Sequence, residues 1–558
     1  MVRPLRMYKT YRRLGRYRQV VFVLAKYGFD DVVERIAPDI ISRKLLKRRG
    51  KKRAEQPTAE RIRMALTELG PTFVKFGQVL STRPDVIPEE YIFELEKLQD
   101  KVDPFPIEEV KKIFMEELGQ EPESLFTRFE EIPIASGSIA QVHSATFPDG
   151  TRVVVKVQRP KIRRLIETDL DILEELANVF ERHIPEARWY RPKGLVEQFS
   201  STIRRELDFI AEGHAAERFR KNFENIETFF IPAVYWDYTT EKLLTIDYID
   251  GVKITNLEEI EKRGYDRVAI ASNGARAILK EIFEDRFFHG DPHPGNFFVM
   301  ENNVIGAVDF GIVGRLDEET TDHLSMLLHA IVNRDVEKAI QVFKYLNVLE
   351  DETDLVLLKY DLMEFVDRYY GLPLEKLDAQ NVVSDLLAVL RRHRIILPVN
   401  LATMGRMLLV SAGVGQMLDP KFDMVAEAKP FIESFMYKRF DPRRQVRDMM
   451  NLFDRFRMTI KMLPDDLEEI VQKLKKGKML VQLHHEGLNK FILEMDRSSN
   501  RLTFGMIIAS LIVGSSLVMQ LDRGPMLFGF SIFGVLGYLI AGILGLWLAI
   551  AILRSGKI

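Results

Sequence analysis

The chain has 558 residues, too many for one ordinary hydrophobic core, so two or more folded regions with appendages are expected. It contains no cysteine, which excludes disulfides, thiolate zinc sites and iron–sulfur clusters. The formal net charge of −2 is unevenly distributed, because residues 1–53 hold 17 lysines and arginines against four acidic residues and leave about −15 for the remaining 505.

The first region, residues 1–57, is a basic arm with a partly amphipathic helical pattern of arginines, tyrosines and valines. A basic arm on an acidic body indicates an anionic partner. Three interpretations are open: a solvated arm, a helix on a membrane surface, and a nucleic-acid-binding segment, of which we expect the last least and predict no nucleic-acid partner. The arm lacks the apolar core and cleavage site of a signal peptide, so the bulk of the chain is expected in the cytosol.

Residues 58–106 form the next region, in which apolar residues recur at helical spacing and Gly70-Pro71 separates two helices. The second helix contains the sequence KFGQ at residues 75–78. From its own neighbours alone, Lys75 is interpreted as a surface lysine.

A helix over 107–119 is followed by alternating apolar and polar residues around a Pro-Asp-Gly turn at 148–150, which predicts a β-hairpin. Lys156 lies inside the second, β-branched strand, where a lone charge requires a partner or a ligand unless it faces solvent at an edge. A bend of small residues precedes the hairpin, and the backbone amides of such a bend can cradle phosphates. Its residues are Ala135, Ser136, Gly137 and Ser138.

Helices are predicted over 162–183 and 194–223, and the second carries Glu206, Asp208 and Glu212. On one continuous helix, Glu206 and Glu212 lie about 120° apart and should address different partners. Two further strands are expected in residues 230–254, which with the hairpin give a mostly antiparallel sheet of about five strands. A helix over 268–287 follows.

The sequence HGDPHPGN at 289–296 concentrates polar side chains on a turn that its prolines and glycines make rigid. Asp291 and Asn296 have the spacing of the kinase catalytic loop, where the aspartate orients the acceptor hydroxyl and the asparagine holds magnesium. Asp309 begins an Asp-Phe-Gly triplet after an apolar strand, a layout typical of a carboxylate that binds Mg²⁺. The prolines exclude a helical pair of histidine zinc ligands here.

The remainder is predicted to be helical, and it ends in two uncharged stretches, 502–521 and 526–553, each long enough to span a bilayer. Basic residues flank their outer ends, so we predict a multi-pass protein of the cell membrane with two helices and both ends in the cytoplasm. A buried soluble helix pair is the alternative. Small residues around Gly534, Gly537 and Gly545 would support helix packing and a homodimer.

The order of these motifs is that of the parts of a protein kinase: strand lysine, acidic helix, Asp-x-x-x-x-Asn loop, Asp-Phe-Gly. The chain resembles the UbiB family of atypical kinases, also called the ABC1 or aarF-domain family, over about residues 58–430, and its C-terminal hairpin resembles that of membrane-anchored prokaryotic members. The resemblance is carried by KFGQ at 75–78, IASGSIAQVH at 134–143, VVVKVQRP at 153–160, ELD at 206–208, HGDPHPGN at 289–296 and DFG at 309–311.

The resemblance implies an α+β, atypical protein-kinase-like fold with a small antiparallel-sheet lobe, a helical large lobe, a helical N-terminal extension and a C-terminal transmembrane helical hairpin. The corresponding regions are the arm 1–57, the KxGQ extension 58–106, the small lobe 107–255, the helical lobe 256–480, a linker 481–501 and the membrane helices 502–553. It further implies that the protein binds ATP or ADP with Mg²⁺ and supports isoprenoid quinone biosynthesis. Membrane lipids, quinone precursors and quinone-biosynthesis enzymes are the implied partners.

The resemblance also assigns roles to residues. Lys156 would hold the α- and β-phosphates beside the bend 135–138, and Asn296 and Asp309 would hold Mg²⁺. Asp291 would orient the nucleophile. The KxGQ element would fold over the site and block a protein substrate, with Lys75 pointing inward toward Glu206 or Asp208. Glu212 is the expected partner of Lys156, although all three acidic residues remain candidates for the nucleotide site.

The glycine in the bend, where the family often has alanines, leaves nucleotide selectivity open. The leading hypothesis is an ATP-dependent phosphotransferase or ATPase acting on or beside quinone precursors at the membrane. The alternatives are a nucleotide-regulated scaffold for quinone-biosynthesis enzymes and a conventional protein kinase, against which Lys75 and the absence of an Ala-Pro-Glu segment after residue 311 argue.

Overall fold

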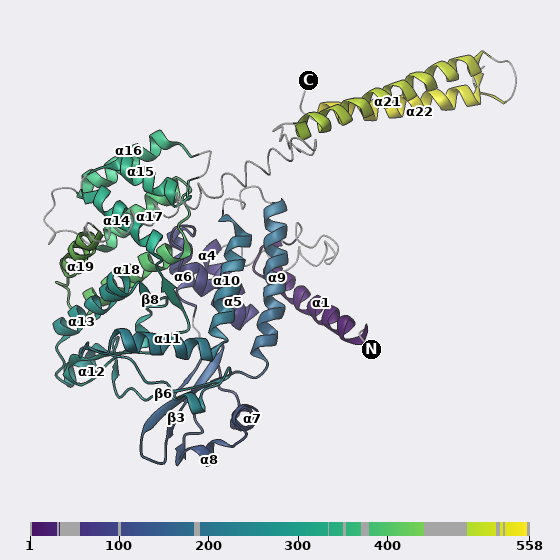
Figure 1. The fold of residues 1–558 in the computed structure, drawn as a ribbon. Helices are drawn as coiled ribbons and strands as arrows, with labels where there is room; N and C mark the ends of the chain where they lie inside the picture. The colour runs from purple at the N-terminus through teal and green to yellow at the C-terminus, as the bar shows by residue number, and fades with distance from the viewer. Residues whose placement is uncertain are drawn as a thin grey trace, which may run out of the picture. The chain divides into compact units, whose positions relative to one another are not determined.

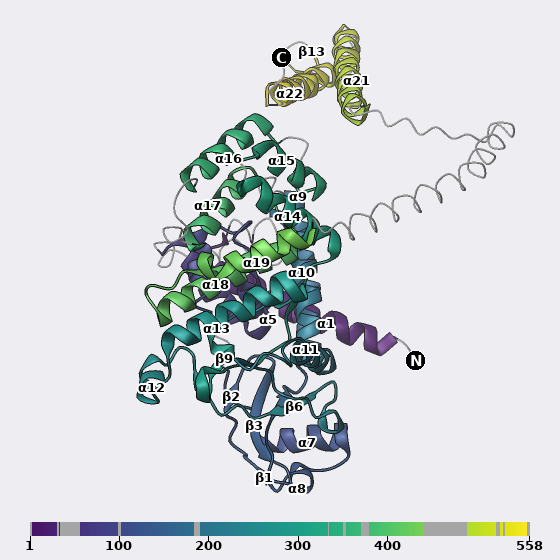
Figure 2. The same cartoon turned by 60° about the vertical axis from the view of Figure 1, so that its left-hand side comes forward.

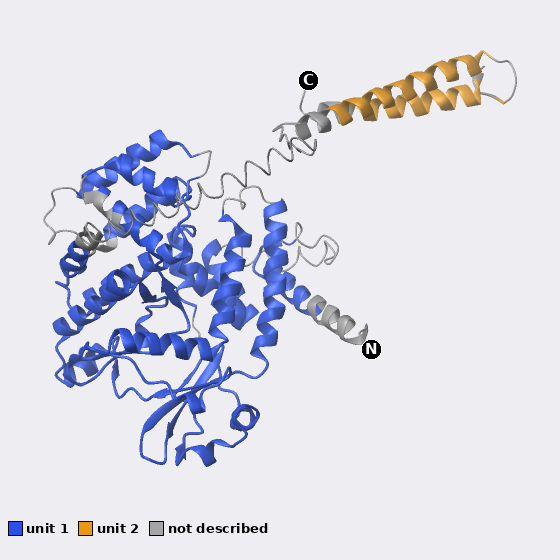
Figure 3. Ribbon diagram, viewed as in Figure 1, with its two compact units in different colours: residues 1–446 blue, residues 447–558 orange. Residues whose placement is uncertain are grey.

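The protein is represented by a computed structural model, which divides into two compact units, residues 1–446 and 447–558 (Figure 3). Within them the structure describes residues 3–30, 33, 56–98, 102–183, 190–332, 334–349, 353–369, 379–439, 488–520, 525–527 and 530–554. Residues 481–487 of the linker expected at 481–501 lie outside these ranges, whereas residues 488–501 are described and are helical.

The small lobe is a five-stranded antiparallel sheet in the order β1-β3-β4-β6, with β2 paired to β3 (Figure 1). Its core joins the sheet to two helices through phenylalanines and valines, because β-branched residues alternate along the strands. The predicted hairpin is confirmed, with Lys156 opposite Val142. The elements are α7 (Ile107–Leu118), α8 (Pro122–Leu125), β1 (Arg128–Phe129), β2 (Ala135–Ser136), β3 (Ala140–Thr146), β4 (Arg152–Gln158) and β6 (Leu243–Asp247).

The strand prediction for 230–254 is only partly right. Its second strand is β6, but the first, β5 (Phe229–Phe230), pairs in parallel with β10 of the large lobe, and β7 (Val252–Lys253) also belongs there. A short 3₁₀ turn, η2 (Trp236–Tyr238), follows β5. The small sheet reaches five strands through β1 and β2 instead.

The acidic helix is two helices. After α9 (Ile162–His183), which matches its predicted range, α10 (Pro192–Glu206) ends and α11 (Phe209–Asn222) begins. The break occurs because the Asp208 side chain accepts hydrogen bonds from the backbone N–H groups of Ile210 and Ala211, as an N-cap. The 120° offset between Glu206 and Glu212 therefore does not apply as calculated.

The large lobe begins with α12 (Leu257–Lys262), α13 (Arg267–Lys280) and a π-helical turn η3 (Glu281–Asp285), so the predicted helix 268–287 changes character at residue 281. Two small sheets follow, β5-β10-β9-β7 and β8-β11. Their elements are β8 (Phe287–His289), η4 (Pro294–Asn296), β9 (Phe297–Val299), η5 (Glu301–Asn303), β10 (Ile305–Ala307) and β11 (Val313–Arg315).

Helices complete this lobe, as the sequence predicted (Figure 2). The central helix α18 packs on α13 and α17, and its buried residues continue the core under β8. The helices are α14 (Glu318–Val332), α15 (Val336–Tyr345), α16 (Leu355–Tyr369), α17 (Ala379–Arg392), α18 (Val399–Leu418) and α19 (Met424–Arg439).

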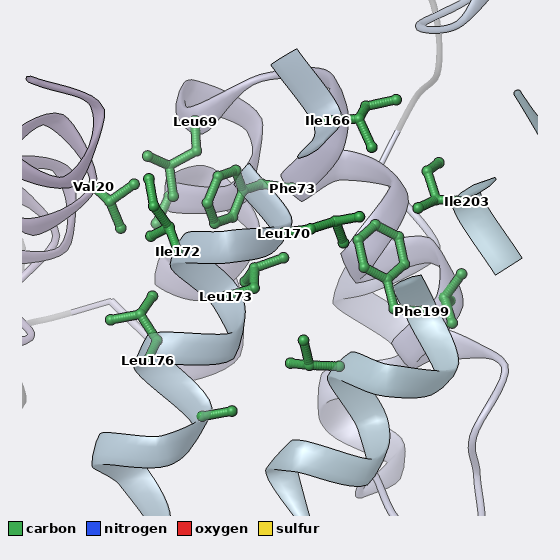
Figure 4. Packing of buried hydrophobic residues seen from close by; sticks show 14 of the residues in the cluster. Val20, Leu69, Phe73, Ile166, Leu170, Ile172, Leu173, Leu176, Phe199 and Ile203 are labelled. Carbon is green, nitrogen blue, oxygen red and sulfur yellow. The ribbon is translucent and has the colours of Figure 1, made fainter. Parts of the chain in front are cut away.

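The N-terminal extension packs on α9 and α10 through a core of its own (Figure 4). It consists of α1 (Arg3–Lys26), α4 (Thr58–Leu69), α5 (Pro71–Ser81) and α6 (Glu89–Leu95). Val20 and Val23 of α1 are buried with Leu69 and Phe73 in this core. A solvated arm or a membrane-surface helix is therefore wrong for residues 15–27, whose apolar face is covered by protein.

The second unit is a helical hairpin of α21 (Leu488–Met519) and α22 (Ile532–Arg554), joined through two very short strands, β12 (Met526–Leu527) and β13 (Phe530–Ser531). A Cβ on Gly537 would lie 2.1 Å from Ser515 Oγ, and one on Gly534 would lie 2.6 Å from the Met519 side chain. These two glycines therefore serve contact within the hairpin, whereas a Cβ on Gly545 would meet nothing.

By length and composition, three helices of the described chain could cross a membrane: Val399–Leu418, Ser498–Met519 and Ile532–Ala549. The share of each apolar window buried inside the protein separates them, at 39%, 6% and 11%. The first belongs to the large-lobe core, and the other two expose their apolar side chains.

Candidate active site

Two loops of the large lobe lie side by side, the 290–296 loop between β8 and β9 and the 308–312 loop between β10 and β11. The Gly290 N–H donates to the Ile312 carbonyl at 2.8 Å, and the Val308 N–H donates to the Asn296 carbonyl at 3.0 Å. Backbone bonds thus fix the loop of Asp291 and Asn296 beside the loop of Asp309 at both ends.

The Asp-Phe-Gly triplet is anchored by its phenylalanine. Phe310 is buried and packs on Phe219 of α11, with the ring centroids 5.0 Å apart. Asp309 has a φ of +65°, an unusual backbone conformation for a non-glycine residue, and its side chain stays 45% exposed. The anchored triplet therefore presents a carboxylate outward next to helix α11.

Lys156 lies between two carboxylates. Its Nζ is 2.9 Å from both carboxylate oxygens of Glu212 and 3.3 Å from Asp309 Oδ1. Burial alone would lower the pKa of Lys156, but Asp309 and Glu212 outweigh burial and raise that pKa above its ordinary value. Lys156 in turn holds the pKa of Asp309 well below its usual range against the effect of burial. The ionised state of this pair is thus stabilised.

Glu212 differs from Asp309 because its side chain is almost fully buried on α11. Burial raises the pKa of the Glu212 carboxyl; Lys156 lowers it and Asp309 raises it further. The structure thus pairs Lys156 with Glu212, as the sequence predicted, while Glu206 pairs with Lys75 in the same site.

Lys75 enters the same site from α5. Its Nζ is 3.1 Å from Glu206 Oε2, at the C-terminal end of α10, and both side chains are largely buried. A Cβ placed on Gly311 would lie 3.5 Å from Asp309 Oδ1, 3.6 Å from Glu206 Cγ and 3.8 Å from Glu212 Oε2. The three carboxylate side chains therefore converge on Gly311, whereas Asp208, the other candidate partner of Lys75, is the N-cap of α11.

Asp291 is oriented by its own loop and by a residue that sequence analysis missed. Its backbone N–H lies 3.1 Å from His289 Nδ1, and the Asn296 side-chain amide donates to its carbonyl at 3.3 Å. Arg406 of α18 places Nη1 3.9 Å from Asp291 Oδ1. A lone arginine on an apolar helix 115 positions further along gives no sequence signal for this contact.

The start of the 290–296 loop is also held by a buried acid, Glu281 of η3. Its Oε2 accepts a 2.9 Å hydrogen bond from the His289 N–H, just before the loop. Burial raises the pKa of Glu281 to about 8, although the His289 N–H opposes this rise. The neutral form of this carboxyl group is therefore favoured at pH 7.

The small-residue bend is partly a strand. Ala135 and Ser136 pair with β3, so the turn proper starts at Gly137. Arg159, directly after β4, holds the turn by donating to the Gly137 carbonyl at 2.7 Å and to Ser136 Oγ at 2.8 Å. Ser138 is buried beyond it. The turn lies at the same end of the β3–β4 hairpin as Lys156.

The side chains present fit a nucleotide with Mg²⁺. Asp309 and Asn296 offer the oxygen ligands that Mg²⁺ prefers, and Mg²⁺ is usually held by one or two carboxylates together with substrate phosphates. Within the described part of the chain no three Asp, Glu or His residues are grouped so as to bind a metal by themselves. Such an arrangement suits a metal that arrives with phosphate better than a permanent metal centre.

Comparison with known proteins identifies the family. Three family models match: the ABC1 atypical kinase-like domain over residues 97–343, the UbiB helical domain over 362–423 and the ABC1/UbiB kinase-like C-terminal domain over 486–554. A protein from Pseudomonas paraeruginosa named "Probable protein kinase UbiB" is 35% identical over 83% of this chain and 88% of its own length. The chain belongs to the UbiB family of atypical kinase-like proteins.

Two further matches cover different shares of the chain. An uncharacterized protein from the hydrogenase 1 5' region of Clostridium pasteurianum is 34% identical over 97% of this chain and 99% of its own length. A solved structure, a complex of Rv3197 with erythromycin from Mycobacterium tuberculosis, has a TM-score of 0.47 at 23% identity, covering 66% of this chain and 94% of that one. The family models and the relatives named UbiB confirm the sequence-based identification as a UbiB-family member with an α+β kinase-like fold.

Proposed function

We propose that this UbiB-family protein is a membrane-anchored, ATP-dependent phosphotransferase or ATPase that supports isoprenoid quinone biosynthesis. The observation that carries the proposal is the ionic cluster of Lys156, Glu212 and Asp309, which has the composition of a kinase phosphate site. The names of the relatives as UbiB support the pathway.

Each residue of the cluster and of the neighbouring loop has a proposed role. Lys156 holds the α- and β-phosphates and is kept in place by Glu212, while Asn296 and Asp309 hold Mg²⁺. When bound, Mg²⁺ supplies neutralisation of the negative charge on the phosphates. Asp291 orients the acceptor, and Arg406 keeps its carboxylate turned toward the site.

The position of Lys75 disfavours a conventional protein kinase. Lys75 of α5 contacts Glu206, whose side chain lies beside Gly311, and we infer that α5 therefore restricts access for a folded protein or a peptide. A small acceptor, or water, fits this arrangement better. Quinone precursors in the membrane are the acceptor class that the proposal favours.

The membrane topology is proposed to be two spans, α21 and α22, with both ends in the cytoplasm. Basic residues at the outer ends of the hairpin support this orientation. The third apolar helix, α18, carries Arg406 into the site, so a span there is incompatible with the fold of the large lobe. We further propose a homodimer through α22, because an added Cβ on Gly542 or Gly545 would have nothing within 4 Å, which leaves room for a second helix to pack there.

Complementation of a strain that lacks the gene tests this function. Quinone content and accumulated intermediates would be profiled with the wild-type gene and with Asp309→Asn at matched protein levels. We expect the wild type to restore the quinone and Asp309→Asn to leave an intermediate in place. Restoration by Asp309→Asn would show that the protein acts as a scaffold, and an unchanged quinone profile in the deletion strain would refute the pathway.

A further inference from the structure

Helix α5 brings Lys75 into the site, but the segment that follows it, residues 82–88, contains no candidate active-site residue. This segment nevertheless holds a buried ion pair. Arg83 Nε and Nη2 donate to the two carboxylate oxygens of Asp85 at 2.8 and 2.7 Å. The side chains are only 4% and 0% exposed. Removing one partner from such a pair leaves an uncompensated buried charge, so the pair is maintained as a unit.

The Arg83–Asp85 pair contacts two other elements of residues 1–446, helix α10 and the start of helix α18. Arg83 Nη1 donates to Gln198 Oε1 at 2.5 Å, on helix α10, whose last residue is the Glu206 that meets Lys75. Asp85 Oδ2 accepts a hydrogen bond from the Leu397 N–H at 3.2 Å, two residues before α18 begins. One buried carboxylate thus connects the segment behind α5 to the start of α18.

Further bonds run in the same direction. Arg391, at the end of α17, donates to the Pro84 carbonyl at 2.6 Å, and Arg83 Nη2 reaches the Leu397 carbonyl at 3.5 Å. The helix on the far side of this junction, α18, carries Arg406, which faces Asp291. The segment therefore lies between the element that supplies Lys75 and the element that supplies Arg406.

We propose that Arg83 and Asp85 are positioning residues that tie the KxGQ extension to the large lobe and hold Lys75 in the site. The tie sets two geometries at once, the Lys75–Glu206 contact through α10 and the Arg406–Asp291 contact through α18. The catalytic meaning of Lys75 rests on the proposed function, but the existence of the tie does not. Its release would allow α5 to leave the site without unfolding the lobes.

Because the chain has no cysteine, a single introduced thiol reports this opening. Thr72 of α5 is 1% exposed, so Thr72→Cys in the full-length protein should react with a thiol reagent only when α5 opens. Thr245→Cys, buried in β6 of the small lobe, is the matched reporter of general unfolding. Both reporters are combined with Asp85→Asn or Arg83→Met, in detergent and without nucleotide.

The exposed pair of Arg204 and Glu167, which joins α10 to α9 through two hydrogen bonds of 2.8 Å, provides the control substitution Arg204→Met. We expect the tie variants to raise the Thr72→Cys reaction rate at least tenfold and to leave Thr245→Cys unchanged, while Arg204→Met moves neither rate more than twofold. An unchanged Thr72→Cys rate, or an equal rise at both reporters, would overturn the proposal. Since no turnover is measured, failure of the proposed function would leave this result standing.

Discussion

Replacing Glu212 by glutamine tests the ionic cluster most sharply. Glu212 accepts two 2.9 Å hydrogen bonds from Lys156, and its carboxylate has almost no access to water. Without this charge, the remaining carboxylate partner of Lys156 in the cluster is Asp309, at 3.3 Å. Lys156 is then expected to move onto the oxygen that the proposed function reserves for Mg²⁺. The variant should therefore lose both phosphate positioning and metal affinity.

The magnitude follows from the strength of the charged hydrogen bonding between Lys156 and Glu212. A hydrogen bond between charged groups contributes about 1.5–3 kcal/mol, so kcat/KM for ADP release should fall about 10- to 100-fold, since each 1.4 kcal/mol is a factor of ten. ADP release would be measured against ATP concentration at saturating Mg²⁺. The exposed-carboxylate control Glu167→Gln should stay within twofold of the wild type. A folded Glu212→Gln protein with wild-type kcat/KM would refute the role of this pair.

Three further predictions concern packing, burial and charge. Gly290→Ala should lower the thermal midpoint and ADP release, because its Cβ would lie 2.5 Å from an isoleucine side chain, whereas Gly311→Ala, with neighbouring atoms at 3.5 Å or more, should keep the midpoint. Glu281→Gln should become more stable relative to the wild type as pH rises from 5 to 8. Because the folded-state pKa of Glu281 is about 8, the stability that its protonated carboxyl group contributes to the wild type is fully present below the unfolded-state pKa and is lost as pH rises toward 8. An equal difference between the denaturant midpoints of the two proteins at pH 5 and pH 8 would contradict this. Arg16→Met should destabilise the protein by about 3–5 kcal/mol, because Asp169, 0% exposed, loses its bidentate partner. The double variant with Asp169→Leu should lose less free energy of unfolding than Arg16→Met alone. Equal losses in the two variants would show that the unpaired charge is not the cause.

Sequence motifs predicted the elements whose structure is set locally. The Lys156 strand, the 289–296 loop and the Asp309 triplet are where their turn residues and β-branched runs placed them. The Lys156–Glu212 pairing was also predicted, but the helix geometry used to support that prediction is not the geometry found in the structure. The offset between Glu206 and Glu212 was calculated on one continuous helix, whereas the N-cap at Asp208 divides it in two.

Contacts between distant segments were not predictable in this way. The basic composition of the arm suggested that it faces solvent or a membrane surface. Arg16 instead donates hydrogen bonds to Asp169 and to the Leu69 carbonyl and so joins the arm to the rest of the protein. Arg406 and the Arg83–Asp85 tie depend on segments about 115 and 310 residues away, respectively. Single-sequence periodicity describes which face of an element is buried but not which element covers it.

The proposed function is tested most directly by ADP release from purified full-length protein with Mg²⁺, compared between the wild type and Asp309→Asn. The assay is run with and without liposomes and a phenolic mimic of a quinone precursor. The wild type is expected to release ADP, with stimulation by the mimic in the presence of liposomes, and Asp309→Asn is expected to lose at least tenfold of this activity. Equal rates in the two proteins would show that the measured turnover is a contaminant and that the site does not catalyse phosphate transfer.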